Sequence, residues 1–318
     1  MKLAFHSEQL GLRGTEIAIY DYAWYSRELL GIEPYIISNV NSNLDALDKF
    51  KKEFPVHLYD NFSEVTSWIN TNKIDSIYYI KGGNFDGKLV SNAKNLVHAV
   101  FQLHQPHGDR YAYVSEWIAK KMNWPHHVPH MVDIQRHVHD RNLREYLNIP
   151  PSTFVFGYHG GNGSFNIPWV QSTVVEVAKR RNDLYFVFMN VTPFGEELSN
   201  VIFLEGTFDL DVKVSFINTC DAMLHARDGG ESFGLSVAEF SMLNKPVFTT
   251  EWCSGGLCDE AHIQMLGDKV NLYTPDTIKS LLTDIQRIDI DGQDWNRYHK
   301  YSPDNVMKQF HKEFIQGV

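Results

Sequence analysis

Two glutamates, Glu231 and Glu239, are the residues of this chain whose type and spacing first suggest chemistry. Glu231 follows a loop rich in charge and glycine, and Glu239 lies inside the helix predicted after it. The segment 221–250 reads as strand, loop, helix and strand, which is the βαβ unit of a parallel sheet. In such sheets ligands bind beyond the carboxyl ends of the strands, where helices begin. The same residues also fit a plain helix with a capping serine, Ser232, and two solvated glutamates.

The start of that helix predicts a place for a phosphate. Backbone N–H groups around Phe233, Gly234 and Leu235 have no partner within a helix, so an anion could accept hydrogen bonds from them. Gly234 has no side chain to block a close approach. Glu239, about one turn further in, could accept hydrogen bonds from a ribose diol. Glu231, on the loop, could meet a sugar beyond the diphosphate.

Composition and charge narrow the class of protein. The 318 residues are 43% hydrophobic and 21% charged, which is ordinary for a globular protein of about two domains. A formal net charge of −10 argues against nucleic acid as a partner. No apolar run is long enough to span a bilayer and no signal peptide is evident, so we expect a cytoplasmic protein without a transmembrane segment. Cys220, Cys253 and Cys258 are too few for a disulfide framework, which agrees with a reducing cytosol.

Strands and helices alternate in both halves, which predicts an α/β fold with two Rossmann-like domains. The chain opens with a strand at 2–6, a loop with two glycines and a helix that Gly31 ends. The loop is not G-x-G-x-x-G, so a dinucleotide site is not indicated. We predict domains at 1–131 and 132–297, with a C-terminal helix at 298–318.

The text around the two glutamates resembles a known signature. E-S-F-G-L-S-V-A-E at 231–239, followed by N-K-P-V, resembles the E-x7-E motif of retaining GT-B glycosyltransferases, especially glycosyltransferase family 4. Four further landmarks occur in the order that this family has them. They are the N-terminal glycine loop, His98, the V-S-E text at 114–116 and the V-P-H-M-V-D text at 128–133, which resembles the family's interdomain hinge. The resemblance covers nearly the whole chain and is strongest at 127–250.

The resemblance implies a GT-B fold, with two Rossmann-like domains whose parallel sheets face an interdomain cleft. The first domain would bind the acceptor and the second a nucleotide-diphosphate sugar, UDP- or GDP-linked, while the C-terminal helix would return to the first domain. The implied activity is transfer of the sugar to a glycan or other hydroxyl acceptor, with retention and without a metal or another cofactor. Alternatives on the same fold are a sugar-nucleotide epimerase, a phosphorylase, or a non-catalytic carbohydrate-binding protein.

The resemblance also implies roles for individual residues. The residues implied to be catalytic are Glu231 and His98. Those implied to bind the donor nucleotide are Glu239, Phe233, Gly234 and Leu235. Further candidates for donor binding, taken from the residues themselves, are Gly160, Gly161, His159 and Arg227. Those that could contact an acceptor or a phosphate from the loops of the first domain are Gly11, Arg13, Gly14, His104, His107 and Asp109.

One departure from the family concerns the diphosphate. Family members carry an arginine and a lysine in the loop after the first strand of the second domain, and both contact the diphosphate. Here Phe156-Gly157 is followed by Tyr158-His159, and no lysine occurs before Lys179. Glycine N–H groups at 160–163 could form an anion nest. The charges that could compensate are those of His159, Arg227 or Arg13.

Metal-ligand patterns are weak in this sequence. The histidines at 126–139 lack an H-E-x-x-H arrangement, and the C-x4-C pair has no further ligand nearby. Asp209 and Asp211 spell D-x-D, which would hold a divalent cation in a different glycosyltransferase fold. The landmarks above favour the GT-B reading, so we expect no metal site.

Overall fold

The computed structural model describes residues 1–317 and divides into two compact units. Unit 1 holds residues 1–133 together with the chain from Tyr301 onward, and unit 2 holds Ile134–Lys300. The sequence placed these boundaries after residues 131 and 297. Each unit is built on a parallel sheet of six strands, and unit 2 has an additional two-stranded sheet.

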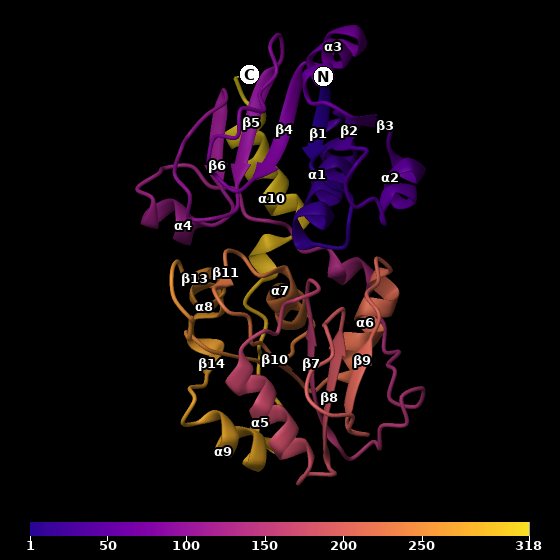
Figure 1. Cartoon of the computed structure of the whole chain (residues 1–318), viewed down its shortest axis with the longest axis vertical. Coiled ribbons are helices and arrows are strands. Elements are labelled where there is room, and N and C mark those ends of the chain that lie inside the picture. Colours follow the sequence, from indigo (N-terminus) through magenta and orange to yellow (C-terminus); the bar gives the residue numbers. More distant parts are fainter. Residues whose placement is uncertain (318) are drawn as a thin grey trace. The chain divides into compact units, whose positions relative to one another are not determined.

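Unit 1 alternates strands and helices from its first residues (Figure 1). The strands at Lys2–Ser7, Ser76–Lys81 and Lys94–Ala99 are almost continuously buried, as expected for a parallel sheet covered on both faces. The elements are β1 (Lys2–Ser7), α1 (Gly14–Leu30), β2 (Glu33–Asn39), α2 (Leu47–Glu53), β3 (Val56–Tyr59), α3 (Ser63–Asn72), β4 (Ser76–Lys81), β5 (Lys94–Ala99), β6 (Arg110–Tyr113) and α4 (Glu116–Lys121).

The C-terminal segment belongs to unit 1. Helix α10 (Pro303–Phe310), followed by a π-helical turn at His311–Ile315, lies beside α1 in Figure 1. The Phe310 ring stacks on Tyr22 of α1 with centroids 5.1 Å apart and meets Tyr78 of β4 edge-on at 5.4 Å. Aromatic contacts of this kind add to the hydrophobic burial. They fix the tail on the sheet of unit 1.

Unit 2 repeats the same alternation after a short 3-10 turn at Ile134–His137. Strand β7 is buried along its whole length. The elements are β7 (Phe154–His159), α5 (Pro168–Ala178), β8 (Leu184–Met189), β9 (Val201–Leu204), α6 (Leu210–Thr219), β10 (Ala222–Leu224), β11 (Gly230–Glu231), α7 (Leu235–Met242), β12 (Val247–Thr249), β13 (Asp259–Glu260), α8 (Ala261–Leu266), β14 (Val270–Leu272) and α9 (Ile278–Asp284).

The two large sheets share one strand order. It is β3-β2-β1-β4-β5-β6 in unit 1 and β14-β12-β10-β7-β8-β9 in unit 2, with every neighbouring pair parallel. This is the doubly wound order, in which the chain reverses direction across the sheet between the first and fourth strands. Ligands bind outside the carboxyl ends of the strands at that reversal. In unit 2 the reversal lies between β7 and β10.

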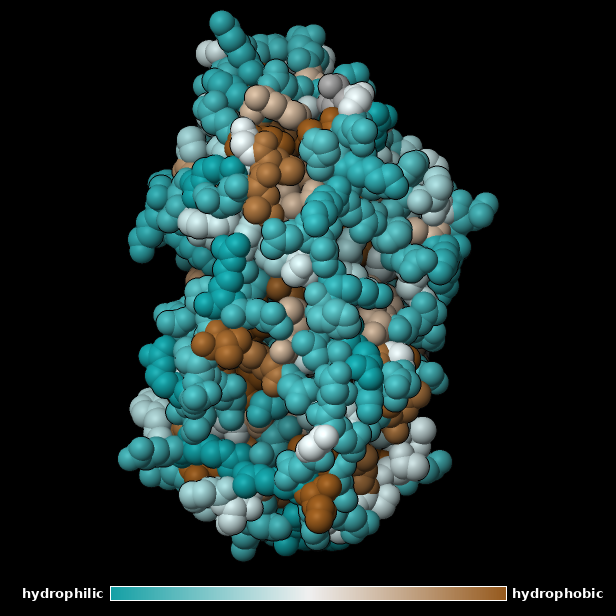
Figure 2. All heavy atoms as spheres, turned by 180° about the vertical axis from the view of Figure 1, so that it is seen from behind, coloured by the Kyte–Doolittle hydropathy of each residue, from teal (hydrophilic) through white to brown (hydrophobic). Residues whose placement is uncertain are grey.

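No helix within residues 1–317 is long and apolar enough to cross a bilayer. The face shown in Figure 2 is mostly hydrophilic, with hydrophobic side chains gathered in separate patches. Patches of this kind are ordinary on a folded protein.

Candidate functional site

The segment after β10 brings the predicted donor residues to the carboxyl end of the unit 2 sheet. Helix α7 begins at Leu235, and Gly234 occupies the cap position with a left-handed φ of 80°. Ser232 lies two residues before this position and does not cap the helix. A Cβ on Gly234 would lie 3.2 Å from the Cβ of Glu231 and 3.3 Å from the Cβ of His262. Glycine is therefore required here for both conformation and space.

Glu231 is a buried, ionised carboxylate with its own cation. Its side chain is 11% exposed, and Arg227 Nη1 donates to Oε2 at 2.5 Å. His225 Nε2 lies 3.4 Å from Oε1. Burial opposes ionisation, but Arg227 and His225 outweigh it and lower the pKa of Glu231 to about 2. Arg227 was predicted to meet the donor; in this structure it pairs with Glu231.

Glu239 is held in the same way by two other elements. Lys213 Nζ, from the first turns of α6, donates to Glu239 Oε1 at 2.9 Å. His159 Nε2, at the end of β7, lies 2.8 Å from Oε2. Burial again opposes ionisation, but Lys213 and His159 outweigh it and lower the pKa of Glu239 to about 2. Glu239 and His159, which were predicted from the sequence, thus lie together with Lys213, which was not, where β7, α6 and α7 meet.

Lys213 was missed from the sequence, although one signal for it exists. In a parallel sheet the helix after each strand starts at the carboxyl edge, so the first turns of α6 and α7 lie at the same edge. Lys213 is the fourth residue of α6 and Glu239 the fifth of α7. A charged residue at matching depth in two successive helices is therefore a candidate for pairing. Nothing in their spacing along the chain points to it.

The glycine loop after β7 is braced by side chains. Asn190 Nδ2 donates to the Gly160 carbonyl at 2.7 Å, and Ser164 Oγ donates to the Gly161 carbonyl at 2.5 Å. A Cβ on Gly160 would lie 2.4 Å from Ser164 Oγ, whereas a Cβ on Gly161 would meet nothing within 4 Å. A side chain at position 160 would therefore displace the Ser164 hydroxyl, whereas one at position 161 would meet no neighbouring atom. Both lie directly after His159.

Tyr158 occupies the position where the family resemblance leads one to expect an arginine. Its ring is 1% exposed and packs against Phe165 and His225, with centroids 5.2 and 5.9 Å away. Burial raises the pKa of the Tyr158 hydroxyl, so it carries no charge at neutral pH. Positive charge near the two carboxylates comes from Arg227 and Lys213 instead.

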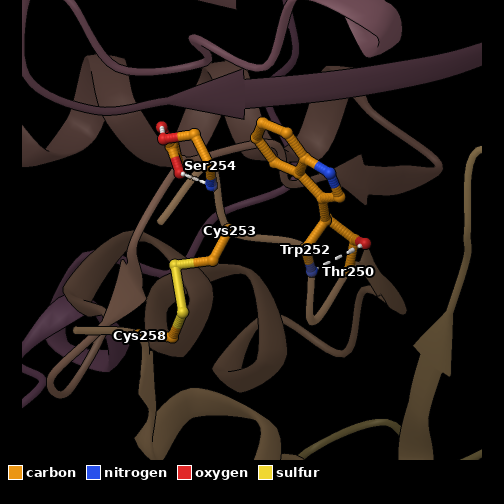
Figure 3. Close-up of a disulfide and its surroundings, with 6 residues drawn as sticks. Thr250, Trp252, Cys253, Ser254 and Cys258 are labelled. Carbon is orange, nitrogen blue, oxygen red and sulfur yellow. Dashed lines mark hydrogen bonds between the residues drawn. A yellow bond between two sulfur atoms is a disulfide. The ribbon is translucent and has the colours of Figure 1, made fainter. Parts of the chain in front are cut away.

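A disulfide braces the loop that carries Glu231. Cys253 and Cys258 are bonded and close the turn before β13 (Figure 3), and β13 pairs with β11. Ser254, inside the turn, donates its N–H and its hydroxyl to Asp228 at 2.9 and 2.5 Å. The sequence predicted no disulfide framework, and this C-x4-C pair was weighed only as a possible metal site. The structure corrects that reading, because a short turn brings the two sulfur atoms together.

The structure argues against the predicted catalytic role of His98. The ring is fully buried in unit 1, with Nδ1 2.5 Å from the Tyr78 hydroxyl and Nε2 2.7 Å from the Val128 carbonyl. Burial lowers its pKa to about 3, so the ring is neutral. A neutral imidazole that donates to Val128 and accepts from Tyr78 uses both ring nitrogens. His98 is therefore a core residue with no atom left for a sugar.

The loop between β1 and α1 holds three of the predicted acceptor or phosphate residues. Arg13 is the exposed N-terminal cap residue of α1, and its backbone N–H donates to Glu16 Oε2 at 3.1 Å. Gly14 is the first residue of the helix. A Cβ on Gly11 would lie 3.0 Å from Asn43 Oδ1. The guanidinium of Arg13 is thus placed at the carboxyl edge of the sheet, on the surface.

The loop between β5 and β6 holds the other three predicted acceptor or phosphate residues. His104 Nδ1 lies 2.8 Å from the Tyr113 hydroxyl, and His107 Nδ1 lies 2.6 Å from the Gln105 carbonyl. Asp109 accepts a hydrogen bond from the Asn95 N–H at 2.8 Å. Asp109 therefore closes the loop onto β5, while the two histidines are anchored through one ring nitrogen each.

The D-x-D residues have structural partners. Asp209 caps α6 by accepting from the N–H groups of Asp211 and Val212, and Asp211 lies 2.9 Å from His137 Nδ1. Among residues 1–317 no group of three metal-ligating side chains is assembled.

Comparison with known proteins gives structural relatives only. No family model matches the chain, and no curated protein matches it. The crystal structure of Anabaena HepE in complex with UDP-glucose superposes with a TM-score of 0.75 at 15% identity, over 98% of each chain. The crystal structure of WaaG, a glycosyltransferase involved in lipopolysaccharide biosynthesis, superposes with a TM-score of 0.68 at 12% identity, over 99% of this chain and 100% of that chain. A putative UDP-N-acetylglucosamine 2-epimerase from Listeria monocytogenes superposes with a TM-score of 0.60 at 12% identity, over 98% of this chain and 96% of that chain.

Likeness at these identities concerns the fold alone. Two parallel six-stranded sheets of the same order, with helices beside each, match the architecture of GT-B glycosyltransferase structures such as WaaG. The chain has the GT-B fold.

Proposed function

We propose that this protein is a glycosyltransferase that moves a sugar from a nucleotide-diphosphate sugar to a hydroxyl acceptor, with retention and without a metal. The observation that carries the proposal is the pair of buried, ionised carboxylates at the carboxyl end of the unit 2 sheet, Glu231 and Glu239. They flank the start of α7, where backbone N–H groups can receive a phosphate. HepE, a relative in fold, binds UDP-glucose.

In the proposed reaction each group has a separate task. The bond between the anomeric carbon and the diphosphate breaks, and the acceptor oxygen bonds to the same face of that carbon. The acceptor proton passes to the leaving phosphate oxygen. Positive charge develops on the sugar ring and negative charge on the diphosphate. Glu231 would orient the sugar, Glu239 would hold the ribose, and N–H groups of Phe233, Gly234 and Leu235 would stabilise the leaving phosphate.

Calorimetric titration with UDP, GDP and ADP tests the proposal. We expect one of them to bind, and Glu239→Gln to weaken it about tenfold or more, because a charge-assisted hydrogen bond contributes about 1.5–3 kcal/mol. Glu231→Gln should leave the affinity for the free nucleotide unchanged and lower the affinity for the nucleotide sugar. Failure of all three nucleotides to bind at millimolar concentration would refute the proposal.

A matched control separates binding from folding. Glu116→Gln removes a glutamate whose side chain is 61% exposed and which lies in unit 1, so it should leave the affinity unchanged and alter the stability by no more than about 0.5 kcal/mol. Thermal denaturation of each variant gives the temperature range in which all are folded. Affinities are compared within that range.

A sugar-nucleotide epimerase is the second candidate, because a putative epimerase has the same fold. Incubation of the protein with a nucleotide sugar and no acceptor distinguishes the two. Appearance of the epimeric sugar nucleotide would favour the epimerase, whereas transfer only on addition of a hydroxyl acceptor supports the transferase.

A further inference from the structure

Two buried histidines and a buried threonine form a chain of contacts that ends on Glu231. His225 follows β10, Thr249 is the last residue of β12, and His262 lies in α8. His225 Nδ1 lies 2.8 Å from the Thr249 hydroxyl oxygen, and that oxygen lies 3.1 Å from His262 Nε2. The other nitrogen of His225, Nε2, lies 3.4 Å from Glu231 Oε1. The contacts therefore link three elements to one carboxylate.

This chain of contacts is too deeply buried to meet a ligand itself. His225, Thr249 and His262 are 1%, 0% and 1% exposed. Removing three polar side chains from water costs free energy that apolar side chains of the same size would not. The exposed end of the chain is Glu231, whose side chain is 11% exposed. Any effect of the three residues on a bound sugar must therefore act through this carboxylate.

The charge of Glu231 sets the direction of the hydrogen bond that it receives. The carboxylate is ionised, so it attracts an N–H at His225 Nε2 and repels a lone pair there. A neutral His225 then accepts from the Thr249 hydroxyl at Nδ1, and the hydroxyl oxygen accepts in turn from His262 Nε2. A protonated His225 reverses these two bonds, because its Nδ1 also donates. In both arrangements the Nε2–H of His225 points to Glu231.

His262 can serve both arrangements. Burial and the neighbouring His225 lower the pKa of His262 to about 3, so its ring is neutral and carries one N–H. Its Nδ1 makes no well-aligned hydrogen bond within residues 1–317, although the backbone of Glu231 lies close enough to oppose part of this pKa shift. The single N–H can therefore lie on either nitrogen. His262 keeps the Thr249 hydroxyl engaged whichever way that hydroxyl points.

We propose that Thr249 and His262 are positioning residues for His225. Through the His225 ring they hold the carboxylate of Glu231, which would orient the donor sugar. Arg227 donates to Oε2 and His225 to Oε1, so both oxygens of this carboxylate are held and it is fixed in one orientation. The inference rests on the proposed function, in which Glu231 contacts the sugar. It adds Thr249 and His262, which no motif in the sequence indicated.

Calorimetry with UDP and UDP-glucose measures the consequence for binding. Thr249→Val keeps the size of the side chain and removes the hydroxyl. It should lower the affinity for UDP-glucose about threefold or more and leave the affinity for UDP unchanged, because only the sugar would meet Glu231. Thr249→Ser keeps the hydroxyl and should retain the affinity for UDP-glucose. His262→Phe should weaken UDP-glucose in the same way as Thr249→Val, and should add little to it in the double variant.

Thr219→Val is the matched control for loss of a buried threonine hydroxyl. Thr219 is also 0% exposed, and its hydroxyl accepts from the Leu143 N–H at 2.7 Å and donates to the Ser215 carbonyl at 2.8 Å. It is the last residue of α6, and a helix between parallel strands ends at the edge opposite the carboxyl ends of the strands. The control should lose stability and keep both affinities. Equal loss of UDP and UDP-glucose affinity in Thr249→Val would overturn the inference.

Nitrogen NMR of the imidazole rings tests the arrangement without any ligand. In the wild-type protein His225 should carry a proton on Nε2. Thr249→Val should shift the signal of His225 Nδ1, because the hydrogen bond at that atom is lost, whereas Thr219→Val should leave the signals of both rings in place. A His225 ring protonated on Nδ1 alone would overturn the inference whether or not a nucleotide binds.

Failure of this inference can be told apart from failure of the proposed function. If Glu231→Gln weakens UDP-glucose and Thr249→Val does not, the positioning role is wrong while the donor site stands. If no nucleotide binds, or if Glu231→Gln binds UDP-glucose as tightly as wild type, the proposed role of Glu231 is refuted and this inference falls with it. If GDP binds in place of UDP, GDP and GDP-glucose are compared in the same variants.

Discussion

The ion pair between Lys213 and Glu239 should be among the strongest single polar contributions to the stability of unit 2. The two side chains are 6% and 7% exposed, and their charged atoms lie 2.9 Å apart. At an effective dielectric constant near 20, two unit charges at this distance attract each other by about 6 kcal/mol. Much of that offsets the cost of removing both charges from water. Removing one partner leaves the other charge buried, so Lys213→Met should lower the free energy of unfolding by about 3–5 kcal/mol.

A double-mutant cycle isolates the interaction. Lys213→Met, Glu239→Gln and the double variant are compared by urea denaturation, since urea, unlike guanidinium, does not screen charge. We expect the double variant to be more stable than the sum of the two single changes implies, by about 2 kcal/mol or more. The control cycle uses Lys120 and Glu116, which are 2.7 Å apart but 73% and 61% exposed. That pair should give about 0.3–0.5 kcal/mol.

Acid provides an independent measure of the same pair. The pKa of Glu239 is lowered from 4.5 to about 2 in the folded protein, so the carboxylate contributes stability above the unfolded pKa. This contribution, about 3 kcal/mol for a shift of this size, is lost as the pH falls from about 5 towards 2. Lys213→Met should flatten this part of the pH profile. A coupling energy below about 0.5 kcal/mol together with an unchanged acid profile would refute the electrostatic reasoning.

Other perturbations test the remaining parts of the site. Gly234→Ala should destabilise by about 1–3 kcal/mol, from a left-handed φ and close contacts, whereas Gly161→Ala should change the melting temperature little. Replacing Cys253 and Cys258 together by serine should lower the free energy of unfolding by about 2 kcal/mol, the loop-closure value for so short a turn. Hydrogen exchange in residues near the turn should become faster, and added reductant should have no further effect on this variant. His98→Gln should lower stability by about 1–3 kcal/mol and leave nucleotide affinity unchanged. Unchanged stability with a loss of nucleotide affinity would instead support a role of His98 in the reaction.

The sequence was informative where a pattern is local. The strand, loop and helix around Glu231 and Glu239 could be read because turn residues, apolar runs and the following proline lie within thirty residues of one another. Gly31 ends α1 in a left-handed conformation, as predicted from its place after an apolar helix. Such features depend on neighbours in the chain, so a single sequence carries them.

The partners of charged side chains could not be read in the same way. Lys213 meets Glu239 because the chain reverses its direction across the sheet between β7 and β10, which places α6 and α7 at one edge. That adjacency is a property of the strand order, and residue spacing does not record it. The same holds for His98. The family resemblance implied a catalytic role for it, yet Phe314 of the C-terminal tail packs against its ring, with ring centroids 5.7 Å apart.

The charges found here bear directly on the absent arginine and lysine. Each glutamate has a cation of its own, Arg227 for Glu231 and Lys213 for Glu239, so neither cation is free of an anionic partner. A bound diphosphate would add negative charge to a site whose formal charges already balance. Backbone N–H groups at α7 and the partly exposed edge of Arg227 are then the donors available to it. In the proposed function, hydrogen bonds donated by these backbone N–H groups and by Arg227 therefore replace much of the electrostatic attraction that the family's arginine and lysine supply.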